Sequence, residues 1–224
     1  MHVLYEESGA FKVGTILADN DASLQVEAPH GKRSKVKTNA VLLRFAEPAP
    51  AELMKQAEAM AAAVDIDFLW ECCGEPEFSF EALAREYCGH APSVLEAAGI
   101  LVKLHAAPVY FYRKGKGRYK AAPPETLQAA LASLEKKRQQ QLAVDGWAAE
   151  LVAGRFPPAL QPMLAELLYK PDRNKPETKA LEKACELAGL SSAKLFARAG
   201  VLPSSHDYHL NRFLFECFPR GTGF

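Results

Sequence analysis

Residues 78–121 read FSFEALAREYCGHAPSVLEAAGILVKLHAAPVYFYRKGKGRYKA, and most of the structural prediction depends on this stretch. Ser79 is a typical N-cap residue, so it predicts that a helix covers 80–88. Gly89 predicts where that helix ends, because glycine readily adopts the left-handed conformation found at helix C-termini. A longer helix is expected over 91–105, with a proline in its first turn, where the missing N–H costs nothing.

A two-stranded signature follows these helices. The Val-Tyr-Phe-Tyr run at 109–112 and the Arg-Tyr-Lys run at 118–120 predict a hairpin, with the Lys-Gly-Lys-Gly sequence as its turn. Apolar residues at helical spacing over 52–72 predict helix in front of them. Three helices followed by a hairpin is the order of a winged helix, a variant of the helix-turn-helix. We expect a winged-helix domain over 52–122, although the same order also suits a purely structural module.

The first 47 residues read as short strands separated by turn residues. The candidate strands are Val3–Glu6, Phe11–Ala18, Ser23–Ala28, Lys32–Lys37 and Val41–Phe45. Strands this short bury little surface as an open sheet, so we expect residues 1–47 to close into a small SH3-like or OB-like barrel. A Pro/Ala linker at 46–51 separates this barrel from the winged helix.

The rest of the chain, residues 123–224, is predicted to be an all-helical connector region. One long helix is expected over 125–154, with Asp145-Gly146 as the point where it could break. Shorter helices, punctuated by prolines, are predicted at 158–169, 177–188, 192–199 and 205–218. The fold class is therefore α+β. The final residues contain no helix-capping signal, which suggests a chain that continues in a longer protein.

Composition excludes several classes of function. Acidic and basic residues number 27 each, so a nucleic-acid surface must come from local clustering of cations. The chain has no apolar run of about 18 residues and no signal-peptide core, so we expect a cytoplasmic protein without a membrane partner. Five cysteines without a C-x-x-C pair predict free thiols in a reducing compartment, not a zinc site or a disulfide frame.

The densest positive cluster lies in the predicted hairpin, where cations alternate with aromatic residues. The candidate nucleic-acid-binding residues are Arg113, Lys114, Lys116, Arg118 and Lys120, with Tyr112 and Tyr119. Each cation that meets a phosphate releases condensed counterions, and aromatic faces stack on unpaired bases. Glycines at 115 and 117 would let the backbone approach a nucleic-acid strand closely. The alternative is a solvated hairpin edge that prevents pairing between sheets, with some tyrosines facing the core.

A second cluster is predicted on the fourth strand of the barrel. It consists of Lys32, Arg33, Lys35 and Lys37. Because side chains alternate along a strand, Arg33, Lys35 and Lys37 share one face, which suits a phosphate backbone. Protection of an edge strand explains the same charges equally well. A third run, at 136–138, is typical of a solvated helix face.

Motifs for catalysis or metal binding are missing from the sequence. It contains neither the glycine-rich nucleotide-binding motifs nor G-x-S-x-G. His206 and His209 could share a helical face but lack a third ligand, and Cys88 with His90 has no orienting partner in sequence, so that pair is interpreted as accidental. No cluster of carboxylates has the density that two-metal cleavage of phosphodiesters needs. We therefore expect no catalytic residue, metal site or cofactor in this chain.

Three stretches along the chain suggest a family. They are FKVGTILADNDASLQVEAPHGKRSKVKTNAVLLRF at 11–45, the stretch at 78–121, and KLFARAGVLPSSHDYHLNRFLFECFPRGTGF at 194–224. In this order they resemble the region before the catalytic domain in a bacterial branch of ribonuclease II-like (RNB-type) proteins. The resemblance spans nearly the whole chain, as a pattern and not as a short diagnostic motif.

The resemblance implies a processive exoribonuclease that needs Mg²⁺, works from the 3′ end of single-stranded RNA and releases nucleoside monophosphates. In such enzymes N-terminal modules guide RNA toward a catalytic domain whose aspartates bind the metal. That aspartate-rich motif has no counterpart in these 224 residues, so no catalytic role carries over. The chain is expected to be a piece of a longer enzyme, with single-stranded RNA and the enzyme's catalytic domain as partners.

Two other functions stay open. One is a winged-helix transcription regulator whose helix over 91–105 would read the major groove of DNA. That helix has one Lys and no Arg, Asn or Gln to contact base edges. The other is a protein–protein docking module that uses the apolar, proline-punctuated C-terminal half. A free-standing hydrolase has the least support.

Overall fold

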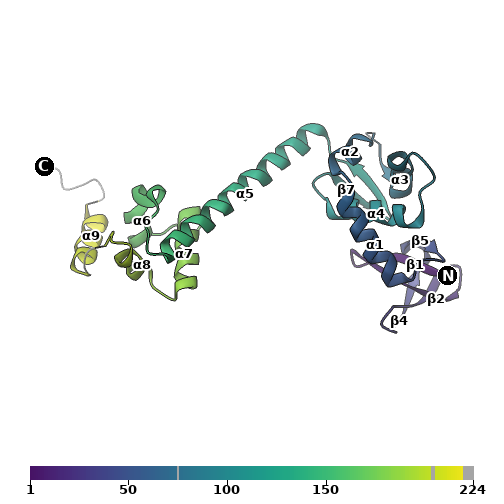
Figure 1. The fold of residues 1–224 in the computed structure, drawn as a ribbon, viewed down its shortest axis with the longest axis horizontal. Coiled ribbons are helices and arrows are strands. Elements are labelled where there is room, and N and C mark those ends of the chain that lie inside the picture. The colour runs from purple at the N-terminus through teal and green to yellow at the C-terminus, as the bar shows by residue number, and fades with distance from the viewer. Residues whose placement is uncertain (75, 203–204, 219–224) are drawn as a thin grey trace. The chain divides into compact units, whose positions relative to one another are not determined.

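The computed structural model describes residues 1–74, 76–202 and 205–218 (Figure 1). The chain has a mixed α+β fold and divides into two compact units, Met1–Leu131 and Ala132–Phe224. Helix α5 (Pro124–Val152) begins in the first unit and ends in the second. Among the described residues, no helix combines the length and the apolar character that crossing a membrane requires.

The first unit opens with a five-stranded antiparallel sheet in the order β4-β3-β2-β1-β5. Its elements are β1 (His2–Glu7), β2 (Ala10–Asp19), β3 (Ser23–Glu27), β4 (Arg33–Lys37), the 3-10 helix η1 (Thr38–Ala40) and β5 (Val41–Phe45). The five predicted strands are confirmed to within about one residue at each end, inside the usual uncertainty of assignment. Closure into a barrel is not confirmed, because the described residues form no backbone ladder between the two edge strands, β4 and β5.

Both faces of this sheet are buried. Side chains alternate along β1, so Leu4 points to one face and Val3 and Tyr5 point to the other. Val3 and Tyr5 share a core cluster with Val36 of β4, and Val41 of β5 packs against the same cluster. Because β4 and β5 are opposite edges, the sheet must bend around these side chains.

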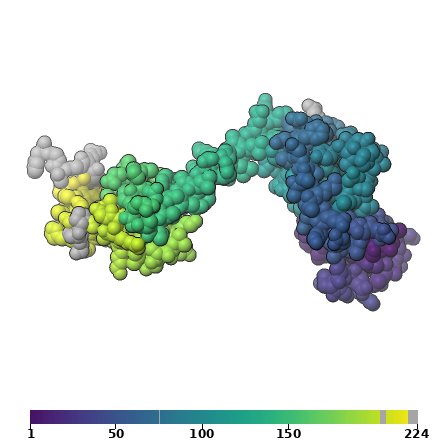
Figure 2. Space-filling model, in the orientation of Figure 1, coloured from purple at the N-terminus to yellow at the C-terminus, as the bar shows by residue number. Residues whose placement is uncertain are grey.

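The helices that precede α5 are α1 (Pro50–Ala63), α2 (Ile66–Glu71), α3 (Phe80–Cys88) and α4 (Val94–Ala106). Of these, α1 packs against β1 and β2, and α4 packs against β5, on the face of the sheet to which Leu4 points. The predicted bounds of α3 are confirmed: the Ser79 side chain accepts from the Ala82 amide, and Gly89 ends the helix at φ 73°. A Cβ at Gly99 of α4 would lie 2.8 Å from Met60 Sδ, so glycine lets α1 and α4 approach closely. In Figure 2 the purple sheet and the blue α1 are in contact.

A second sheet completes the first unit, with β6 (Phe78–Ser79), β7 (Phe111–Gly115) and β8 (Arg118–Ala121) in the order β6-β8-β7. The predicted hairpin is confirmed as β7 and β8, whereas β6 was not predicted. One core cluster contains Leu4 and Phe45 of the first sheet, Leu101 of α4 and Phe111 of β7. The hairpin is therefore supported by the same core as the first sheet.

The second unit is helical. Beyond α5 it contains the 3-10 helix η2 (Pro158–Met163), α6 (Leu164–Tyr169), α7 (Pro176–Ala188), α8 (Ser192–Arg198) and α9 (Ser205–Cys217). Helix α5 continues through Asp145-Gly146, so the break considered there does not occur. Ala148 and Leu151, just beyond the glycine, are buried in the core of this unit. Their packing offsets the roughly 1 kcal/mol that glycine costs inside a helix.

Candidate nucleic-acid interface

Alternation along the hairpin divides the predicted binding residues between two faces. The register pairs Tyr112 with Lys120 and Arg113 with Tyr119. Tyr119 lies in the core with 3% of its surface exposed, and burial raises its pKa to about 12. Tyr112, which is 38% exposed, and Lys120 lie on the opposite face. Tyr119 stands on the side of β8 that faces the core, so neither face of its ring is open to a base. It is therefore no longer a candidate binding residue.

Three successive left-handed residues form the tip of the hairpin: Gly115 (φ 83°), Lys116 (φ 53°) and Gly117 (φ 71°). Nothing lies within 4 Å of the position that a Cβ on Gly115 would take. A Cβ on Gly117, in contrast, would lie 2.7 Å from the Phe80 ring and 3.3 Å from Leu42. Gly117 therefore packs the hairpin against α3 and β5. Of the two glycines expected to open the backbone to a ligand, only Gly115 is open.

Two of the five hairpin cations are held by acids. Arg118 Nε donates to Glu77 Oε1 at 2.6 Å. Arg113 Nη1 lies 3.9 Å from the Glu6 carboxylate and 3.2 Å from the nearest ring nitrogen of His105. Burial, and then the Arg113 guanidinium, lower the pKa of His105, so the imidazole beside it is neutral at neutral pH. These contacts give Arg113 a structural role between the hairpin and the first sheet.

The other three hairpin cations are exposed lysines: Lys114, Lys116 and Lys120. Within the described part of the chain, none of them forms an ion pair. With Tyr112, which lies across the strands from Lys120, they make up what we call the wing surface. This surface combines cations that are free to meet phosphates with an aromatic ring that is open to solvent.

A hollow of about 540 Å³ opens beside Lys120. Its lining includes Trp70 of α2, the Cys73-Gly74 turn and the segment 121–124. Trp70 Nε1 donates to the Ala122 carbonyl at 2.9 Å, which fixes the indole ring. The volume lies within the roughly 300–1,000 Å³ that is typical of small-ligand pockets, so a nucleobase would fit. Sequence reasoning missed this hollow, since a Trp near the end of a short helix was its only local signal.

The second cationic cluster lies on edge strand β4, as predicted. Arg33, Lys35 and Lys37 are exposed and share one face, and Lys32 is exposed just before the strand. Arg33 Nε donates to Glu27 Oε1 on β3 at 3.1 Å. No ion pair of the three lysines is found among the residues that the structure describes. Protection of an edge strand still explains this cluster as well as RNA contact does.

A smaller hollow, of about 260 Å³, connects the hairpin tip with the first sheet. Lys116 lines it together with Glu6, the Ser8-Gly9 turn and Asn39-Ala40. Asn39 and Ala40 belong to η1, which directly follows Lys37. The tip of the hairpin therefore lies close to the end of β4. The Lys37 end of the second cluster is therefore the part nearest to the hairpin tip, where Glu6 adds a negative charge beside Lys116.

In the winged helix that the sequence predicts, α4 would be the helix that enters the major groove of DNA. Ala97–Leu101 and Leu104 are buried in the core, and Ala106 is the only exposed residue among the 13 of this helix. A helix enters the major groove with an exposed, polar face that contacts base edges. α4 presents no such face.

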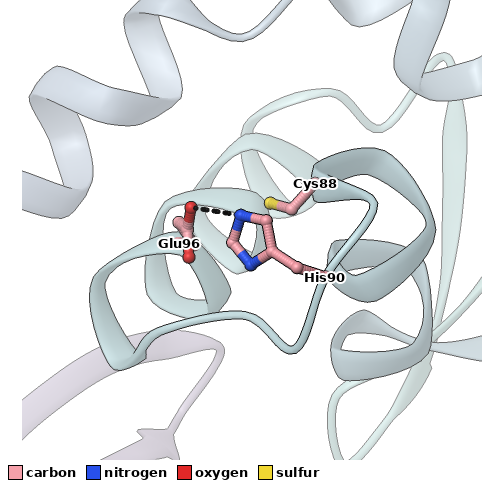
Figure 3. Close-up of side chains that lie close together, drawn as sticks. All are labelled: Cys88, His90 and Glu96. Carbon is pink, nitrogen blue, oxygen red and sulfur yellow. Dashed lines mark ion pairs between the residues drawn. The ribbon is translucent and has the colours of Figure 1, made fainter.

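The residue pairs considered for metal binding differ in their surroundings. In the described chain, no third ligand gathers around His206 and His209 on α9. Cys88 and His90 do acquire one, because Glu96 lies beside them (Figure 3). Sequence reasoning missed Glu96, which was visible only as part of the helix-capping pattern Ser-x-x-Glu.

No protein-family model, curated protein or solved structure matches this chain. Its function must be inferred from its own residues.

Proposed function

We propose that this chain binds single-stranded RNA through the wing surface and the adjoining Trp70 hollow. The observation that carries the proposal is the group of three exposed lysines that form no ion pair within the described residues. Lys114 and Lys120 stand beside an exposed tyrosine, on a sheet whose other face is buried in the core, and Lys116 stands at the tip of the hairpin. The lysines supply sequence-independent contacts with phosphates. Tyr112 and the hollow can receive unpaired bases, which a duplex keeps stacked inside.

We further propose that the first unit is a small SH3-like or OB-like barrel joined to a winged helix. The bent five-stranded sheet supports the barrel, since side chains of β4 and β5 meet in one cluster. The element order α2, β6, α3, α4, β7, β8 supports the winged helix, because the strand before α3 joins the hairpin in one sheet. In this proposal β7 and β8 are the wing.

The parent protein in this proposal is a ribonuclease II-like 3′–5′ exoribonuclease, and the chain is its N-terminal, non-catalytic region. The chain would guide RNA to a Mg²⁺-dependent catalytic domain. Exposed Leu210, Phe213 and Phe218 at α9 and just beyond it offer an apolar surface for contact with that domain. Sequencing the gene downstream of the Phe224 codon tests this. An open frame with clustered aspartates would support it, and a stop codon with no such frame would contradict it.

A transcription regulator that reads duplex DNA is a weaker candidate, because Ala106 is the only exposed residue among the 13 of α4. Competition between an unstructured RNA and a DNA duplex of the same length separates the two functions. We expect the RNA to bind more tightly. A clear preference for the duplex would reverse the order of the two proposals.

The direct test of RNA binding is fluorescence anisotropy with a labelled, unstructured RNA over a range of salt concentrations. The test variant carries Lys114→Glu, Lys116→Glu and Lys120→Glu. The control variant carries the same charge change at exposed lysines of the second unit: Lys170→Glu, Lys179→Glu and Lys194→Glu.

We expect the hairpin variant to bind about 100-fold more weakly at low salt, and the slope of log K against log salt to fall by about 2. The control variant is expected to bind like the unmodified chain. Absence of binding at low salt, or equal losses in the two variants, would refute the proposal.

A further inference from the structure

The turn between α3 and α4 gathers Cys88, His90 and Glu96 (Figure 3). Each residue offers one ligand atom, and the three atoms lie within 4.8 Å of one another. They are the Cys88 sulfur, a His90 ring nitrogen and a Glu96 carboxylate oxygen. Cys88 is the last residue of α3, and the left-handed Gly89 turns the chain directly after it. Glu96 stands in the first turn of α4, which a capping box with Ser93 fixes in place. Two well-defined helix ends therefore hold Cys88 and Glu96, and His90 stands in the turn between them.

Outer contacts orient two of these three groups. His90 Nδ1 lies 3.0 Å from the Ala91 carbonyl, a contact that places a proton on Nδ1 and leaves the lone pair on Nε2. Nε2 faces Glu96 Oε1 at 3.5 Å. The other oxygen of Glu96, Oε2, accepts from the Ser93 amide at 2.7 Å. Contacts of this kind fix the tautomer and the direction of metal-ligating histidines and carboxylates.

The spacing fits a metal better than a direct ion pair. A charge-assisted N–H···O bond is normally about 2.7–2.9 Å long, shorter than the 3.5 Å between His90 Nε2 and Glu96 Oε1. Ligands at about 2.0–2.3 Å from a tetrahedral Zn²⁺ ion stand roughly 3.3–3.7 Å from each other. The observed separation falls within that range, so an ion between the two groups requires little movement of them.

The charges also suit a divalent cation. A Cys88 thiolate and the Glu96 carboxylate would together balance two positive charges, with a neutral imidazole as third ligand. The C-terminal end of α3 adds the partial negative charge of its last carbonyl groups. Without a metal, burial, then the charge of Glu96 and a hydrogen bond to it, raise the pKa of the Cys88 thiol. A bound ion would take the place of that thiol proton.

We propose that Cys88, His90 and Glu96 bind Zn²⁺, with solvent as the fourth ligand. The His90 side chain is 60% exposed, which leaves room for water on the ion. A thiolate and an imidazole favour zinc over Mg²⁺ and Ca²⁺, which prefer ligand sets made of oxygen. The ion links the end of α3 to the start of α4 and stabilises the turn between them. The site is independent of the RNA proposal, since none of its ligands belongs to the wing surface.

Cobalt substitution is the first test, on the full chain under reducing conditions. We expect Co²⁺ to produce a thiolate-to-metal charge-transfer band and the strong visible absorption of tetrahedral cobalt, and one equivalent of Zn²⁺ to abolish both. Competition with a chromophoric chelator then gives the zinc affinity. We expect zinc binding to weaken at least about 10-fold in each of three variants: Cys88→Ser, His90→Gln and Glu96→Gln. Loss of a residue that only orients a metal ligand already weakens metal binding by about 10-fold, so loss of a ligand should cost at least as much. Glu96→Gln keeps an acceptor for the Ser93 amide, so it spares the capping box.

Cys217→Ser and His30→Gln are the matched controls, because both residues are exposed and lie outside the cluster. They are expected to bind zinc like the unmodified chain. With zinc at about 100 times its Kd, the Tm of the unmodified chain should rise by about 5–10 °C, and that of Cys88→Ser should not. Far-UV circular dichroism verifies that each variant is folded. No charge-transfer band, a band that survives in Cys88→Ser, or an equal loss in Cys217→Ser would overturn the proposal.

Discussion

The two cationic hairpins of the first unit, β7–β8 and β3–β4, look alike in sequence and differ in their surroundings. Each has an arginine held by an acid, Arg118 by Glu77 and Arg33 by Glu27, and each keeps exposed lysines. Only β7–β8 adds an exposed tyrosine and a hollow lined by an indole ring. Positive charge gives both hairpins affinity for phosphates. Exposed aromatic rings and a hollow can also bind unpaired bases, which distinguishes single-stranded nucleic acids from other polyanions.

The turns of the two hairpins give the first prediction. Gly117 and Gly31 are both left-handed, but only Gly117 is packed against neighbours. Gly117→Ala should therefore destabilise the first unit by about 3 kcal/mol, through backbone strain and overpacking against Phe80. Gly31→Ala should cost only about 1 kcal/mol, from strain alone. Urea unfolding of the full chain measures both. Equal losses would mean that the β7–β8 turn is no more firmly held than the β3–β4 turn.

Charge reversal on β4 is the second prediction. A variant with Lys32→Glu, Lys35→Glu and Lys37→Glu should weaken RNA binding by about 5–10-fold, compared with about 100-fold for the three lysines of the wing surface. The smaller loss is expected because, in the proposal, β4 lies outside the main RNA contact and meets fewer phosphates. Anisotropy with the same RNA measures both variants. A larger loss from the β4 variant would make that strand the main contact with RNA.

The third prediction concerns the exposed ring of the wing surface. Tyr112→Ala should weaken RNA binding by about 5–30-fold, which corresponds to about 1–2 kcal/mol for one stacked base. Tyr112→Phe should retain most of the affinity, because the ring face remains. Phe213→Ala, at another exposed aromatic residue, is the control and should have no effect. If Tyr112→Phe lost as much affinity as Tyr112→Ala, the hydroxyl and not stacking would explain the contact.

The smallest effects come from the acids that hold the two arginines. Glu77→Gln should free Arg118 and strengthen RNA binding by about 2–3-fold, because one more cation can meet a phosphate. Glu27→Gln should free Arg33 with a gain of less than about 2-fold. Both ion pairs are largely exposed, so each change should alter the free energy of unfolding by less than about 1 kcal/mol. Weaker binding in Glu77→Gln would show that Arg118 is needed in its present position.

The sequence predicted most boundaries because the signals that set them are local. Ser79 and Gly89 bound α3 through contacts that span a few residues, and alternation located the five strands of the first sheet. The single long helix expected over 125–154 is confirmed as α5, and Gly146 does not interrupt it because the residues that follow are buried. Strand β6 was not predicted, because it depends on Phe78 pairing with Tyr119 far along the chain.

Local chemistry was enough to predict an α+β chain with two clusters of cations on β-hairpins. The contacts that side chains make with residues far away in the sequence could not be predicted in the same way. Only in the folded chain does Arg113 meet Glu6, Trp70 donate to the Ala122 carbonyl, and the middle of α4 become buried. Capping and alternation act between residues that are near in sequence. Burial and ion pairing instead depend on which distant segments share a core, so only the folded chain shows which cations form ion pairs. The approach of Glu96 to Cys88 and His90 also depends on how the turn between α3 and α4 folds.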